Sequence, residues 1–127
     1  MRIMSFSKQW PKLKKPRFTT FRFPRRDKDW LTGETVQVYL KNRSPNRKYQ
    51  GLAVIESIEP RDLGQAERYN DAPAVTEEEA IEDGFKSLYL MVQFMKETHG
   101  IQRLEAEPIN KITLQWLKAH HNQNLDP

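Results

Sequence analysis

The chain has 127 residues, a formal net charge of +4 and no cysteine. This length suits a single domain, and the absence of cysteine excludes a disulfide framework and a thiolate metal site. No apolar run is long enough to cross a membrane and no secretion signal is visible, so we expect a cytoplasmic protein with no membrane partner and no cofactor.

The charge is unevenly distributed along the chain. Residues 1–30 hold ten Lys and Arg against two Asp, a net charge of +8, whereas residues 51–127 hold seven against fourteen acidic residues, a net charge of −7. This split predicts a basic surface from the first part and an acidic one from the second, a field that attracts polyanions to one face. Alternatively, the two parts neutralise each other across the fold.

The first half of the chain predicts strands. Residues Ile3–Phe6 form either a short leading strand or part of an arm. The residues of Arg17–Phe23 alternate as a strand does, and Thr35–Leu40 presents a regular apolar face. Tyr49–Ile58 is a longer β-prone run, which we expect Pro60 to end.

The second half predicts two helices and a closing strand. Thr76 and Glu79 form a capping box that begins one helix, and Gly84 ends it. Ser87 caps a second helix that runs to about Thr98. Its apolar stripe should pack in the core: Leu88, Leu90, Met91, Phe94 and Met95.

A strand at Ile109–Leu117 completes the pattern, and residues 62–74 and 118–127 read as a loop and a polar tail. Strands grouped around one helical insertion, with hairpin-like links among the early strands, indicate an α+β fold. The simplest form is a small curled or closed sheet with helices against its open end.

The run from Lys14 to Arg26 contains six cationic side chains and three phenylalanines. Cations interleaved with aromatic rings suit a partner that offers phosphates and flat bases, although a solvated edge strand explains the same pattern. Lys12 belongs to the same basic surface, and Phe18 and Trp30 are candidates for base stacking. The candidate binding residues are Lys14, Lys15, Arg17, Thr20, Arg22, Arg25, Arg26 and Lys28.

Within the strand, Thr20 and Arg22 point to the same side, and Arg17 can turn to join them. Asp83 precedes a glycine at a helix end, where a carboxylate can face these arginines either in a functional cleft or in a structural ion pair. No phosphate-binding loop, nucleophile elbow or metal-ligand spacing is present, so we expect no metal.

Three segments together resemble the ASCH domain family, a branch of the PUA-like superfamily. They are Arg17–Arg22, Thr32–Val38 and Ala80–Leu88, with Ile109–Leu117 as the closing strand, and the resemblance covers about residues 3–117. It implies one domain, a small PUA-like β-barrel of about five to six strands with two or three helices at its mouth. It also implies a basic cleft that binds RNA or a modified nucleoside.

Some members of that family are small amidohydrolases that remove the acyl group from N4-acetylcytidine, using a motif Lys, a Thr and a Glu. The resemblance places Arg17, Thr20 and Asp83 at these positions, and Arg22 at the motif arginine. Arg17 cannot serve as a base because a guanidinium keeps its proton, and Asp83 is one methylene shorter than Glu. Lys15 is the nearest substitute for the missing lysine.

Three functions therefore remain open. The first is an RNA- or nucleotide-binding module. The second is an amidohydrolase of an acylated nucleoside, with Thr20 and Asp83 in its active site. The third is an interaction domain that docks an acidic protein partner on the basic face.

Overall fold

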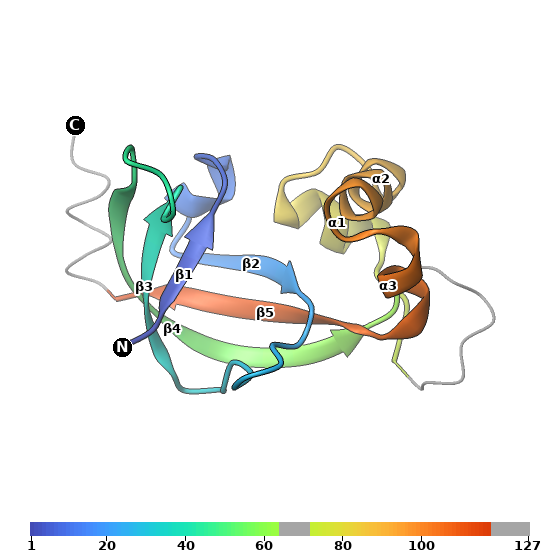
Figure 1. Ribbon diagram of the computed structural model, residues 1–127, viewed down its shortest axis with the longest axis horizontal. Coiled ribbons are helices and arrows are strands. Elements are labelled where there is room, and N and C mark those ends of the chain that lie inside the picture. Colours follow the sequence, from blue (N-terminus) through green and yellow to red (C-terminus); the bar gives the residue numbers. More distant parts are fainter. Residues whose placement is uncertain (64–71, 118–127) are drawn as a thin grey trace.

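The computed structural model describes residues 1–63 and 72–117, and it has the predicted α+β class (Figure 1). Most of the predicted loop before the first helix, and the predicted tail, lie outside these residues. The elements in chain order are strand β1 (Ile3–Phe6), the 3-10 helix η1 (Pro11–Lys14), β2 (Arg17–Arg22), β3 (Thr35–Leu40), β4 (Lys48–Arg61), helices α1 (Glu77–Asp83), α2 (Leu88–His99) and α3 (Ile101–Ala106), and β5 (Ile109–Trp116).

The described strands form one mixed sheet of five, in the order β1-β3-β4-β5-β2. β1 pairs with β3 in parallel and the other pairs are antiparallel. Register shifts after Val38 and after Ile55 help to bend the strands, and the sheet curls into a half-barrel. The prediction of hairpin links among the early strands was correct only for β3 and β4, because β2 crosses over to pair with β5.

The expectation that Pro60 ends the long strand was wrong. β4 continues to Arg61, and Pro60 pairs with Asn110 of β5. β3 accompanies β4 only as far as Val54, so Pro60 lies where β4 has a strand neighbour on one side alone. Proline is tolerated at such an edge because the side that faces no strand needs no N–H donor.

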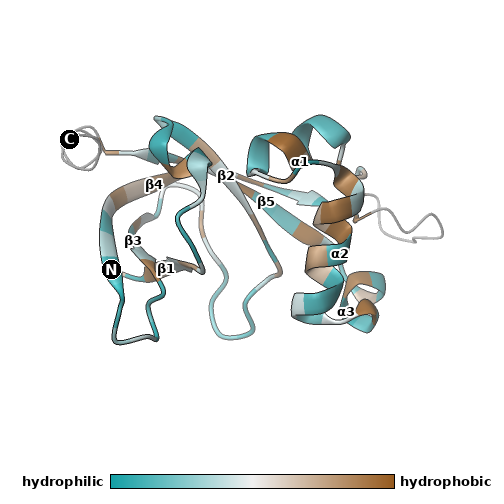
Figure 2. Cartoon of the chain, turned by 90° about the horizontal axis from the view of Figure 1, so that it is seen from above, coloured by the Kyte–Doolittle hydropathy of each residue, from teal (hydrophilic) through white to brown (hydrophobic). Residues whose placement is uncertain are grey.

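Two buried clusters divide the interior. One lies under the curl of the sheet and includes Met4, Val38 and Ile55. The other packs β2 and β5 against the helices through residues such as Phe21 and Met91. In Figure 2, apolar colour lies on part of β4 and on parts of helices α1 and α2. The space between the two clusters is where the candidate site lies.

The helices gather at one end of the sheet (Figure 1). The capping box of Thr76 and Glu79 is confirmed, as is the left-handed glycine at position 84. In the predicted apolar stripe of α2, Met91 and Met95 are buried, but Leu90 and Phe94 are exposed, because the helix packs along a narrower face than expected. The short helix α3 was not predicted.

The two rings proposed for base stacking are both buried, Phe18 at 3% and Trp30 at 5% exposure. Phe18 packs against Phe6 and Trp116 in the first cluster, which removes it as a stacking surface.

No helix in the described ranges 1–63 and 72–117 has the length and apolarity to cross a bilayer.

Candidate functional site

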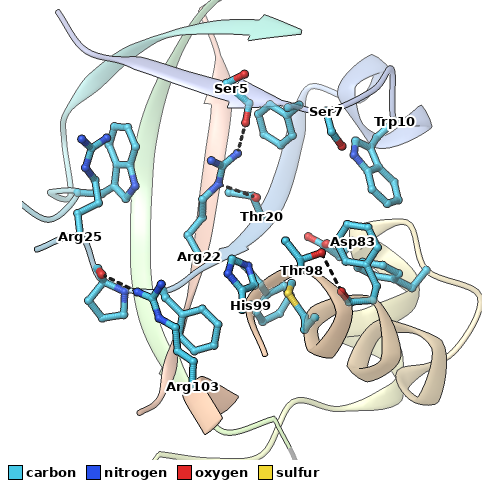
Figure 3. Close-up of a pocket in the computed structure, with 18 of the residues that line it drawn as sticks. Ser5, Ser7, Trp10, Thr20, Arg22, Arg25, Asp83, Thr98, His99 and Arg103 are labelled. Carbon is cyan, nitrogen blue, oxygen red and sulfur yellow. Dashed lines mark hydrogen bonds between the residues drawn. The ribbon is translucent and has the colours of Figure 1, made fainter. Parts of the chain in front are cut away.

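A pocket of about 710 Å³ opens between the curled sheet and the helices (Figure 3). β1, β2, the loop after β2, the end of α1 and α2 all contribute to its walls. Its lining is mixed: aromatic rings, arginines and buried polar groups. The aromatic members are Phe6, Trp10, Phe21, Phe23, Trp30, Phe85 and Phe94.

Arg22 crosses the gap between the two edges of the sheet. It is the last residue of β2, and its guanidinium Nη2 donates to the Ser5 carbonyl oxygen of β1 at 2.7 Å. Its Nε donates to the Thr20 hydroxyl at 3.2 Å, so these two side chains share a side of the strand as predicted. Figure 3 shows both hydrogen bonds. The Cζ carbon of Arg22 lies 4.9 Å from the centre of the Phe6 ring.

Burial lowers the pKa of Arg22 to about 10, with the nearby Arg25 acting in the same direction and Asp83 opposing it. The guanidinium is therefore still a cation at neutral pH. A desolvated cation that lines an open pocket is a strong partner for an incoming anion.

Asp83, 4% exposed, is held by a lysine and a threonine. Its Oδ1 accepts from Lys12 Nζ at 3.0 Å and from the Thr19 hydroxyl at 2.9 Å. Its second oxygen, Oδ2, accepts no hydrogen bond from any residue that the structure describes. Because a buried polar atom normally finds a partner, Oδ2 is suited to accept from a bound ligand.

Burial dominates the ionisation of this pair. It raises the pKa of Asp83, against the opposing effect of Lys12 and Thr19. It lowers the pKa of Lys12, with Arg22 acting in the same direction and Asp83 opposing. Both shifts favour the neutral forms, because removing two charges from water costs more than their attraction returns.

Gly84 fixes how Asp83 approaches the sheet. It ends α1 in the left-handed region, at φ +114°, and its N–H bonds back to the carbonyls of Ala80 and Ile81. A Cβ at this position would lie 2.8 Å from Cε3 of Trp10, so the absent side chain lets the indole pack against the helix end. The same indole lines the pocket.

Two guanidinium groups lie over the buried Trp30 ring at the opposite wall. The Cζ of Arg2 is 4.5 Å and the Cζ of Arg25 is 5.3 Å from the ring centre. Arg2 is held by an ion pair with Glu34, and Arg25 by one with Asp27. Trp30 therefore positions Arg25 at the pocket rather than offering a free stacking surface.

His99 is a titratable group of the pocket wall, in edge contact with the Phe23 ring. Partial burial lowers its pKa below 6.5, and Arg103 and Arg22 act in the same direction. The folded state thus binds fewer protons than the unfolded chain just below pH 6.5, and stability is lost as the pH falls through that window.

We predict that His99→Gln weakens the dependence of stability on pH between 7.5 and 5.5. Urea unfolding of the wild type and the variant at both pH values measures this. The wild type should lose more stability than the variant on acidification. Equal losses would show that His99 does not contribute to this dependence.

The predicted site residues divide into two groups. Five of them line the pocket described above: Thr20, Arg22, Arg25, Arg26 and Asp83. The other predicted residues do not line it: Lys14, Lys15, Arg17 and Lys28.

The expectation that Arg17 turns to join Thr20 and Arg22 was wrong. Its side chain is exposed and forms an ion pair with Glu56 of β4. Arg17 is five residues before Arg22, so it has the opposite parity on the strand, and an acidic partner lies within its reach.

The expectation of a surface role for Lys12 was also wrong, because Lys12 is 5% exposed and bonded to Asp83. Sequence reasoning missed Thr19, His99 and Arg103 as site residues. The capped helix end at Gly84 was a usable signal for Asp83, but nothing in the local pattern placed Lys12 beside it.

Comparison with protein-family models, with curated proteins and with solved structures finds no match for this chain. The fold and the site therefore define the class by themselves: an α+β protein whose described strands form a curled mixed sheet of five, beside a pocket lined by aromatic rings, arginines and buried polar groups. In the described part of the chain, no three His, Asp or Glu side chains gather as a metal-binding group.

Proposed function

We propose that this pocket binds a nucleotide, most naturally one nucleotide of an RNA strand, within a PUA-like fold of the ASCH type. The observation that carries the proposal is that Arg22, Thr20 and Asp83 line one pocket of about 710 Å³ with aromatic walls. A cytoplasmic setting belongs to the same proposal, since RNA is found there.

The chemistry of the wall matches the parts of a nucleotide. Arg22 and Arg25 offer planar cationic groups for a phosphate. Exposed ring surface, such as that of Phe94, can contact the flat face of a base. The Oδ2 atom of Asp83 can accept from an exocyclic amino group, which would distinguish bases that carry one.

Arg22→Gln should weaken RNA binding and reduce its salt dependence. Loss of one phosphate contact lowers the slope of log K against log salt by roughly one unit, which a titration with a fluorescent single-stranded RNA at two or more salt concentrations measures.

Arg17→Gln is the matched control, since it removes the same charge from the same strand outside the pocket. It should change affinity and slope much less than Arg22→Gln. Equal effects of the two variants, or no RNA binding by the wild type at low salt, would reject the pocket as the binding site.

A second candidate function is amide hydrolysis, and the buried Lys12 favours it. Lys12 lines the pocket, and burial lowers its pKa, which favours the neutral amine that can act as a base. In an acetylated cytidine, water would add to the acetyl carbon as Lys12 accepts its proton. The carbon–N4 bond would then break as N4 takes that proton, which gives acetate and cytidine.

Under this second candidate, Lys12→Arg should lower the turnover of N4-acetylcytidine about 100-fold or more, because arginine keeps the positive charge but cannot accept a proton. Lys14→Arg, on the same 3-10 helix but exposed, is the control and should retain turnover. Chromatography of released cytidine measures both, and a wild type with no turnover above buffer excludes this function.

A further inference from the structure

We propose that the hairpin formed by β3, β4 and the turn between them is a second RNA contact. It holds the RNA on the side of β1 that faces away from the pocket. This inference rests on the proposed function, because it extends the nucleotide pocket to a longer chain. It concerns cations and tyrosines that lie outside the pocket lining.

The hairpin carries positive charge that no acidic side chain of its own compensates. Residues 35–55 contain four cationic residues and no acidic residue. All four side chains are exposed, and none forms an ion pair with a residue in the described ranges. Arginines elsewhere do form such pairs, as Arg2, Arg17 and Arg61 show. The four cations are Lys41, Arg43, Arg47 and Lys48.

Two tyrosines give this charged segment a stacking surface. Tyr39 and Tyr49 are cross-strand partners, with ring centres 5.3 Å apart. The guanidinium of Arg47 lies 4.8 Å from the centre of the Tyr39 ring. The Tyr49 side chain is 43% exposed. Cations along a path beside a partly exposed ring are the features with which proteins hold single-stranded RNA.

The hairpin is bonded to the wall of the pocket. The Lys41 N–H donates to the Phe6 carbonyl at 2.8 Å, and the Asn42 N–H donates to the Ser5 hydroxyl at 3.1 Å. Ser5 and Phe6 both line the pocket, and the Ser5 carbonyl accepts from Arg22. One short strand therefore separates the nucleotide pocket from the hairpin, so a chain of a few nucleotides can contact both.

The test compares a mononucleotide, cytidine 5′-monophosphate, with a single-stranded RNA of twelve nucleotides on the full-length protein. Arg43→Glu/Arg47→Glu should weaken binding of the RNA about tenfold or more, and Tyr49→Thr at least fivefold, consistent with a lost stacking contact. Neither variant should change binding of the mononucleotide. Lys86→Glu/Lys96→Glu, with the same change in charge on the helical side, is the control and should bind the RNA more tightly than the hairpin variant.

The outcomes separate this inference from the pocket. Loss of RNA binding in the hairpin variants supports the inference, even if the wild type binds no mononucleotide and the pocket proposal fails. Equal RNA affinity of the hairpin and control variants overturns it, as does a wild type that binds no RNA. Binding of a polyglutamate peptide is measured in parallel. If the hairpin variants lose affinity for this peptide but not for the RNA, the inference is overturned and the hairpin is assigned to an acidic protein partner instead.

Discussion

Asp83→Ala should destabilise the protein by about 3–5 kcal/mol, the usual effect of removing one member of a buried ion pair. The variant leaves Lys12 buried without its acceptor and leaves the Thr19 hydroxyl without its partner. Urea unfolding followed by circular dichroism measures the loss.

The double variant Lys12→Met/Asp83→Leu should recover most of that stability, because it removes both charges and refills the space with apolar atoms. Arg17→Gln breaks an exposed pair and is the control that should change little. If Asp83→Ala unfolds no more easily than Arg17→Gln, the buried pair is not a determinant of this fold.

Gly84→Ala is expected to cost about 1–3 kcal/mol from its backbone conformation alone, with a further cost from overlap with Trp10. The new Cβ would meet the indole at 2.8 Å, and the ring would have to shift into the pocket or away from it. Urea unfolding measures the destabilisation, and intrinsic fluorescence reports a change in tryptophan packing.

Gly33→Ala provides the comparison, since Gly33 also has a positive φ, +89°, in the turn closed by the Glu34 N–H and the Leu31 carbonyl, but has open space where its Cβ would be. It should show the backbone cost without the overlap. Equal losses in the two variants would mean that the Trp10 contact adjusts freely and does not constrain the helix end.

The sequence predicted correctly those features that depend on residues close together in the chain. The capping box at Thr76 and the alternation of Thr35–Leu40 depend only on neighbouring residues, and both predictions were confirmed. Pairing across the sheet depends on distant segments. Nothing in Ile3–Phe6 reveals that it lies parallel to β3, and nothing around Arg22 reveals that its partner is the Ser5 carbonyl.

The candidate site was predictable only in part for the same reason. Strand parity brought Thr20 and Arg22 together, and the glycine after Asp83 marked a carboxylate at a helix end. Lys12 looked like one of several surface cations, because its partner Asp83 is seventy-one positions away and approaches only in the folded chain. Arg17 was predicted to be a site residue because no acidic partner lies near it in the sequence. Its partner in the fold, Glu56, is thirty-nine positions away.

The hydrogen bond from Arg22 to Ser5 gives ligand binding a mechanical consequence. Within the described sheet, β1 and β2 are the two edge strands, and the Arg22 guanidinium spans the gap between them. A phosphate that captures Arg22 competes with the Ser5 carbonyl for the same N–H groups. Under the proposed function, occupancy of the pocket would change the distance between β1 and β2, and with it the curvature of the sheet.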